Sequence, residues 1–125
     1  MKKYAILLIS LFFANTVSAA PKDIFVCQNN KTKVAVSDAG TKGYRYTQWT
    51  TSRSRPVLVL HSKQMRVEGE GACAYKVYSF FRPNGWLNEV YVFNSKEKCD
   101  DSSPNVKGWV VATVYERDVS HLDCK

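Results

Sequence analysis

Two histidines, His61 and His121, are the side chains most suited to acid–base chemistry in this sequence. In a basic protein two imidazoles can cleave RNA, with one acting as general base, the other as general acid, and a lysine stabilising charge on the phosphorane. That reaction requires both imidazoles to reach one substrate, which a sequence does not reveal. Their flanking residues match no catalytic setting. A small ribonuclease or toxin that uses His61 and His121 is therefore an alternative, not the main hypothesis.

Other catalytic motifs are missing from the sequence. No Gly-x-Ser-x-Gly nucleophile motif is present, which argues against a serine hydrolase. Gly69-Glu70-Gly71 is a glycine pair interrupted by an acid, with no helical pattern after it, so it predicts a flexible turn and not a phosphate-binding loop. We expect no catalytic residues and no cofactor.

The four cysteines point to disulfides and not to a metal site. Cys27, Cys73, Cys99 and Cys124 lie at least 25 positions apart, whereas a structural zinc site needs closely spaced Cys or His pairs. An even number of cysteines in an exported chain indicates two disulfides, for which three connectivities are possible. We favour Cys27 with Cys124, tying the two ends of the domain together, and Cys73 with Cys99, tethering a long loop.

The N-terminus has the features of a secretory signal peptide. Lys2 and Lys3 precede an apolar run over residues 5–14, and small residues end at Ala19. The run is too short to span a membrane. We expect cleavage after Ala19, which makes residues 1–19 the signal peptide and residues 20–125 a single domain. The predicted location is the periplasm or the cell exterior.

Charge gives a weaker indication of a partner. Removing residues 1–19 from the 125-residue chain leaves 106 residues, and losing Lys2 and Lys3 lowers the formal net charge from +7 to +5. A basic surface attracts polyanions, so an anionic-polymer or surface-binding module is a further alternative. We do not expect nucleic acid as the partner, because export separates the protein from most nucleic acid and no nucleic-acid-binding module is recognisable.

Alternation of apolar and polar residues dominates the exported part, and no segment shows a helical apolar stripe. The clearest feature is the run 74–82, the turn Pro83-Asn84-Gly85 and the run 86–93, which predicts a hairpin. Asn29-Asn30 predicts another hairpin turn, and residues 94–107 a polar loop of about fourteen residues holding Cys99. We expect an all-β domain: a small antiparallel barrel or sandwich of about seven to eight strands with two disulfides. The predicted strands are residues 24–27, 33–37, 44–49, 57–60, 74–82, 86–93 and 109–115.

Some residues resemble a known family of small exported bacterial proteins. Phe25-Val26-Cys27 supplies an early aromatic-x-Cys, Cys124 is a cysteine next to the last residue, and residues 69–75 form a central glycine-rich segment that reaches a tyrosine. This layout is similar to that of the MliC-type inhibitors of c-type lysozyme and of immunity proteins of similar build. In that family a Ser-Gly-x-x-Tyr loop is inhibitory. Here Glu70 replaces the serine before Gly71, and Tyr75 falls one position later.

The resemblance implies a non-catalytic protein that blocks a cell-wall hydrolase or another envelope-targeted effector. The partner-binding residues it implies lie in the segment from Glu68 to Tyr75 and in a nearby pair of arginines: Glu68, Glu70, Gly71, Tyr75, Arg53 and Arg55. Because c-type lysozymes are strongly basic, a +5 chain would be repelled by them. We therefore expect a neutral or acidic protein as the partner.

Overall fold

The computed structural model describes residues 22–94 and 106–125. The predicted signal peptide and most of the predicted loop 94–107, including Cys99, lie outside these ranges. The described residues contain nine strands and two short 3-10 helices, and none of their helices is long and apolar enough to cross a membrane. The strands are β1 (Asp23–Gln28), β2 (Thr32–Asp38), β3 (Tyr44–Thr50), β4 (Leu58–Ser62), β5 (Met65–Glu68), β6 (Tyr75–Phe81), β7 (Trp86–Val92), β8 (Gly108–Val114) and β9 (Arg117–Cys124), and the helices are η1 (Gly40–Lys42) and η2 (Gly71–Cys73).

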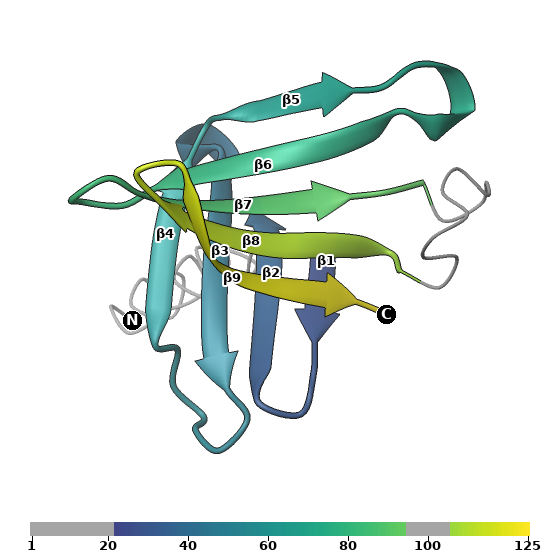
Figure 1. Ribbon diagram of the computed structural model, residues 1–125. Helices are drawn as coiled ribbons and strands as arrows, with labels where there is room; N and C mark the ends of the chain where they lie inside the picture. The colour runs from purple at the N-terminus through teal and green to yellow at the C-terminus, as the bar shows by residue number, and fades with distance from the viewer. Residues whose placement is uncertain (1–21, 95–105) are drawn as a thin grey trace, which may run out of the picture.

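The strands form two antiparallel sheets that pack as the layers of a sandwich (Figure 1). β1 to β4 make the first sheet and β5 to β9 the second, and in both sheets each strand pairs with its neighbour in sequence. The strands of the two layers cross steeply (Figure 1). Within the described residues no strand of one sheet pairs with a strand of the other. The all-β prediction and the sandwich are therefore confirmed, and the closed-barrel alternative is wrong.

The prediction of seven to eight strands is also wrong, because β5 and β9 were not foreseen. These strands are the two edges of the five-stranded sheet, and most of their side chains are exposed. Edge strands are often rich in charged residues, which removes the alternating apolar signal. The turn before β9 consists of Tyr115 and Glu116 at φ values of 47° and 69°, although such turns normally use Gly or Asn. No turn signal therefore marks this hairpin in the sequence.

The core lies between the sheets and explains the period-two pattern. Side chains at alternate positions of a strand point to one face, so each sheet contributes one apolar face. Val36 and Tyr46 of the first sheet and Phe80 and Val90 of the second are fully buried. The ring centroids of Tyr46 and Phe80 lie 5.5 Å apart. The opposite face of each sheet remains available for other roles.

One disulfide is found within the described residues, where two were expected. Cys27 of β1 is bonded to Cys124 of β9, and both residues are buried in the core, so the predicted pairing of the domain's ends is confirmed. Cys99, the partner expected for Cys73, lies outside the described residues. The Cys73–Cys99 bridge therefore stays a prediction.

Two predicted hairpin turns are confirmed. In the first, the Asn29 side-chain oxygen accepts hydrogen bonds from the backbone N–H groups of Lys31 and Thr32 at 2.8 and 2.7 Å. This asparagine therefore acts through its side chain and not through a positive φ. In the second, Asn84 and Gly85 have φ values of 64° and 77°, as a tight hairpin turn requires.

The disulfide predicts a large stability effect. Replacing both Cys27 and Cys124 with alanine should lower the free energy of unfolding by about 4 kcal/mol, because the bridge closes a loop with a sequence separation of 97 residues. Urea unfolding followed by tryptophan fluorescence measures this change while leaving Cys73 and Cys99 intact. An unfolding free energy equal to that of the wild type would show that the sheets stay together without the bridge.

Candidate functional site

The segment that the sequence analysis singled out forms the turn between β5 and β6. It contains η2, and it extends beyond the second sheet at the upper right of Figure 1. Gly69 and Gly71 have φ values of 79° and 63°, which favour glycine. A Cβ added at Gly69 would lie only 3.2 Å from the Cys73 carbonyl oxygen, so this end of the turn is tightly folded. Glu70 and Gly71 lie exposed at its tip.

A hydrogen-bonded network holds the base of this turn. Glu68 at the end of β5 lies opposite Tyr75 at the start of β6, and the Tyr75 hydroxyl donates to Glu68 Oε2 at 2.9 Å. The Arg66 Nε donates to Glu68 Oε1, and Arg66 Nη1 donates to Glu89 Oε2 at 2.8 Å and to Ser79 Oγ at 3.1 Å. The guanidinium thus links three strands, β5, β6 and β7. This arrangement fixes both ends of the turn relative to the sheet.

The network changes the titration of its members. Hydrogen bonds from Arg66 and then from Tyr75 hold the pKa of the Glu68 carboxyl below its ordinary value. The hydrogen bond to Glu68 raises the pKa of the Tyr75 hydroxyl, and hydrogen bonds to Glu68 and Glu89 raise the pKa of the Arg66 guanidinium. At neutral pH the network therefore contains ionised Glu68 and Arg66 and a protonated Tyr75 that donates its hydrogen bond.

Aromatic rings continue from Tyr75 across the outer face of the second sheet. The Tyr75 ring lies 5.5 Å from Phe93, Phe93 lies 4.8 Å from Trp109, and Trp109 lies 5.4 Å from the His121 imidazole, all between ring centroids. Tyr91 contacts both Tyr75 and Trp109. Edge-to-face and tilted ring contacts add stability beyond the area they bury. The row therefore packs Tyr75, at the base of the turn, against other rings of the second sheet.

Sequence analysis missed most of this support. It named Glu68 and Tyr75 but not Arg66 as their partner, nor Glu89, Tyr91 and the other residues of the network and the aromatic row. The alternation within the predicted hairpin 74–93 already places Tyr75 and Tyr91 on one face, and that was the available signal. Arg66 could not be placed, because β5 was not predicted as a strand.

Arg53 and Arg55 do not join this site. Both are exposed in the loop between β3 and β4. Figure 1 shows that loop at the lower end of the first sheet, far from the β5–β6 turn at the upper right. The structure therefore brings Glu68 and Tyr75 into direct contact and places Glu70 and Gly71 beside them, but it leaves the two arginines at the other end of the molecule.

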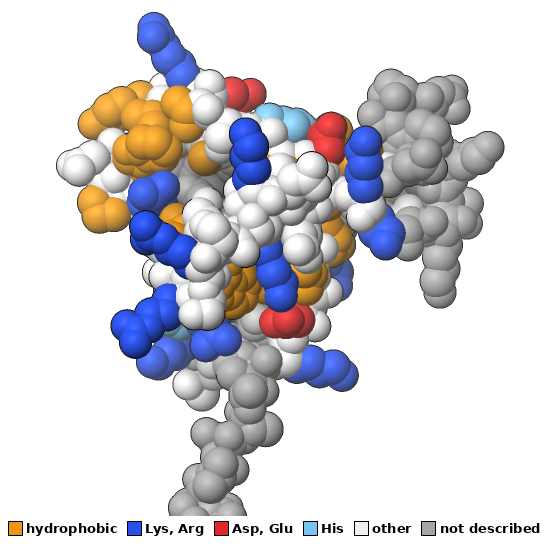
Figure 2. Space-filling view, turned by 90° about the horizontal axis from the view of Figure 1, so that it is seen from below, with side chains coloured by type: hydrophobic (Ala, Val, Ile, Leu, Met, Phe, Trp, Pro, Cys, Tyr) orange, Lys and Arg blue, Asp and Glu red, His pale blue; other side chains and the backbone are white. Residues whose placement is uncertain are grey.

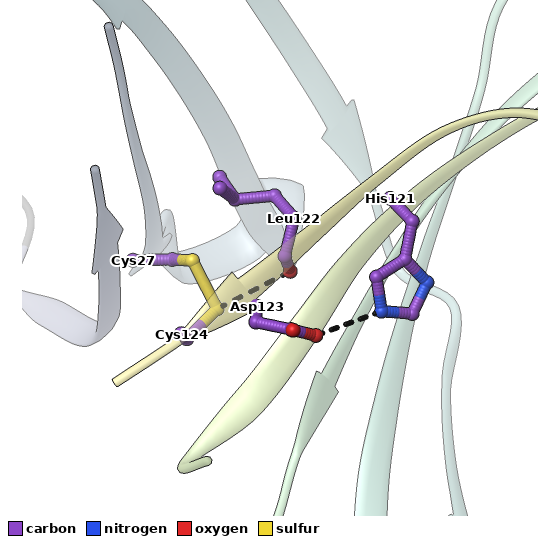
Figure 3. The surroundings of a disulfide bond; sticks show 5 residues. All are labelled: Cys27, His121, Leu122, Asp123 and Cys124. Atoms are coloured by element: carbon purple, nitrogen blue, oxygen red, sulfur yellow. Dashed lines mark hydrogen bonds and ion pairs between the residues drawn. A yellow bond between two sulfur atoms is a disulfide. The ribbon is translucent and has the colours of Figure 1, made fainter. Parts of the chain in front are cut away.

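The two histidines lie on opposite outer faces of the sandwich. Leu58 and Leu60 of β4 pack on the core, so His61 between Leu60 and Ser62 points outward from the first sheet. The His121 ring packs on Trp109 at the outer face of the second sheet, and its Nε2 lies 2.9 Å from Asp123 Oδ1. Figure 3 shows His121 and Leu122 extending from β9 in different directions, with the Cys27–Cys124 disulfide on the side of Leu122. Two imidazoles separated by both sheets cannot act on one substrate.

Searches for similar proteins give no further identification. No family model, no curated protein and no solved structure matches the chain. Among residues 22–94 and 106–125, no group of three or more His, Cys, Asp or Glu side chains could hold a metal ion. The site is therefore interpreted from its own geometry.

The network predicts a pKa change that can be measured residue by residue. Because Arg66 favours the ionised carboxylate, Arg66→Gln should raise the pKa of Glu68 toward its ordinary value. In the wild type the Arg66–Glu68 interaction is fully present when the pH is above the ordinary pKa of a glutamate. It is lost as the pH falls through the lowered pKa of Glu68. An NMR titration of the Glu68 carboxyl carbon tests this shift.

The control is Lys76→Gln on β6, which removes one positive charge from an exposed position. An unchanged Glu68 pKa in Arg66→Gln would refute the network.

The placement of the histidines predicts the result of an RNA-cleavage assay. A pair acting as acid and base would lose activity in both His61→Ala and His121→Ala, and we expect no cleavage that depends on both residues. Loss of a measurable cleavage rate in each variant, with both variants still folded, would overturn this assignment.

Proposed function

We propose that this protein is an exported, non-catalytic inhibitor or immunity protein that blocks an enzyme acting on the cell envelope. Its binding element is the β5–β6 turn, residues 69–74, supported by Glu68 and Tyr75. The predicted signal peptide and the confirmed Cys27–Cys124 disulfide favour a periplasmic or extracellular location, because disulfides persist in oxidising compartments.

The observation that carries this proposal is the combination of an exposed tip and a fixed base. Glu70, Gly71 and Ala72 are exposed, whereas the base is joined by the Tyr75–Glu68 hydrogen bond. The Asn94 side-chain amide also donates to the Ala72 carbonyl oxygen at 2.7 Å. A binding loop that is ordered before association loses less conformational entropy when it binds, which favours affinity. Such a turn can enter the cleft of an enzyme with little rearrangement.

Charge indicates the kind of enzyme. The chain is basic overall, with a formal net charge of +7 including the predicted signal peptide, so association with an acidic or neutral enzyme is favoured over a basic one. Within residues 69–74 Glu70 is the only charged residue. We infer that Glu70 faces a basic or hydrogen-bond-donating group inside the partner's cleft, while the rest of the protein surface steers the encounter.

Two matched glycine substitutions test the proposal. Gly71 and Gly40 have φ values of 63° and 64°, and a Cβ added at either would meet nothing within 4 Å. Gly71→Arg should raise the protein concentration needed for half-inhibition of an acidic or neutral peptidoglycan hydrolase at least roughly tenfold, because a truncated or blocked interface centre typically costs more than 1.4 kcal/mol. Gly40→Arg, which places the same charge and backbone strain in the β2–β3 turn, should leave inhibition unchanged. Clearing of a peptidoglycan suspension measures both.

Equal inhibition by the wild type and Gly71→Arg would show that the turn does not bind the enzyme. A panel of acidic and neutral hydrolases in which none is inhibited by the wild type would refute the inhibitor assignment itself.

A further inference from the structure

A second candidate site lies between the two sheets, away from the turn. It is a cavity of about 500 Å³, a size common for small-molecule sites. Tyr46 and Gln48 of β3 line one side, and Asn88 of β7 lines the other. Leucine, valine and alanine side chains together with Trp86 make up the apolar part of the wall. None of its lining residues is an Asp or Glu.

One buried polar group in this wall has no partner. Asn88 is 3% exposed, and its side-chain Oδ1 atom makes no hydrogen bond with any described residue. A buried amide oxygen without a donor is unfavourable, and almost all such groups in folded proteins are satisfied. The neighbouring Tyr46 hydroxyl is already used, because it donates to Gln48 Oε1 at 2.6 Å. The Oδ1 atom itself has no solvent-exposed surface, so a donor group in the cavity reaches it once the Asn88 side chain turns toward the ligand.

Tyr46 remains a neutral phenol in this environment. Burial raises the pKa of its hydroxyl, and the Asn88 side chain and the positive charge of Arg82 reverse only part of that increase. Both Asn88 and Arg82 thus act on the oxygen of Tyr46 from the second sheet. Tyr46, Asn88 and Arg82 therefore form one polar group within the wall, and the other polar residues of the lining are Asn29, Thr32, Gln48, Ser120 and His121.

Arg82 supplies a positive charge at the same wall. Its guanidinium lies over the Trp86 ring, 4.7 Å from the centroid, and makes no ion pair with a carboxylate of the described residues. Stacking on tryptophan holds the guanidinium while leaving its N–H groups for an anion. An arginine in a wall without acidic residues favours a ligand with a carboxylate.

The surroundings of the cavity are basic as well. Asn29 and Thr32 beside the β1–β2 turn and Val57 after the β3–β4 loop contribute to the lining, and Lys31 and Arg55 lie one and two positions from them in sequence. The Thr51 N–H donates to the Lys31 carbonyl oxygen at 3.1 Å, which joins the turn to the loop. Figure 2, a view of the lower end of the molecule in Figure 1, shows mostly Lys and Arg among the charged side chains of this face. Such a field attracts anionic ligands.

We propose that this inter-sheet cavity binds a small amphipathic carboxylic acid that carries a hydroxyl group. Its carboxylate pairs with Arg82, its hydroxyl donates to Asn88 Oδ1, and its hydrocarbon part packs on the apolar wall between the sheets. This site is independent of the β5–β6 turn, so its test does not depend on the inhibitor proposal.

The probe for the test is β-hydroxydecanoate, titrated into the purified protein by isothermal calorimetry. Decanoate lacks the hydroxyl and should bind several-fold more weakly, and the methyl ester of β-hydroxydecanoate lacks the charge and should bind at least roughly tenfold more weakly. Arg82→Gln should weaken binding of the acid by a similar factor. Arg117→Gln, which removes an exposed arginine of β9 that does not line the cavity, should leave the affinity unchanged.

Asn88→Leu provides a second variant with a readout of its own. It removes the acceptor while keeping a side chain of similar size, so it should abolish the preference for β-hydroxydecanoate over decanoate without abolishing decanoate binding. In the wild-type protein, the chemical shifts of the Trp86 indole and of the Asn88 side-chain amide should move as β-hydroxydecanoate is added. Absence of binding by the wild type, or equal affinities in the wild type and Arg82→Gln, would overturn the proposal.

Discussion

The sandwich depends on contact between two sheets that share no backbone hydrogen bonds in the described part of the chain. Each sheet is a meander that satisfies its own backbone, so apart from the short chain connection between β4 and β5 the layers are held together by side-chain contacts. Tyr46 and Phe80 meet in the core, and the Cys27–Cys124 bond links the edge strands β1 and β9. Burial of apolar surface supplies the attraction, and the bond limits how far the layers separate when the chain unfolds.

This construction leaves two different places for function. The second sheet uses its inner face for the core, so its outer face can carry the Arg66–Glu68–Tyr75 network and the aromatic row behind the exposed turn. Between the steeply crossing layers the side chains do not fill all the space, and a cavity with the unpaired Asn88 oxygen remains. A turn on a rigid sheet suits a macromolecular partner, whereas a cavity that opens to solvent between the sheets suits a small molecule.

Local patterns in the sequence predicted the parts of the fold that depend on neighbouring residues. Alternation and turn residues located the β6–β7 hairpin, and the positions of Cys27 and Cys124 near the ends of the domain suggested their bond. β5 and β9 were missed, because edge strands need no apolar face and Tyr115-Glu116 is an unusual turn. The contact of Tyr75 with Glu68 required knowledge that β5 pairs with β6. The cavity could not be foreseen, since it depends on how the two sheets are placed across from each other.

The account assigns partner binding to the β5–β6 turn and not to the basic loop at the other end of the molecule. Hydrogen–deuterium exchange of the protein, alone and with an inhibited envelope hydrolase, tests this assignment most directly. We predict slower exchange of backbone amides in residues 69–75 and no change in residues 51–57. Protection of residues 51–57 with unchanged exchange in residues 69–75 would contradict it.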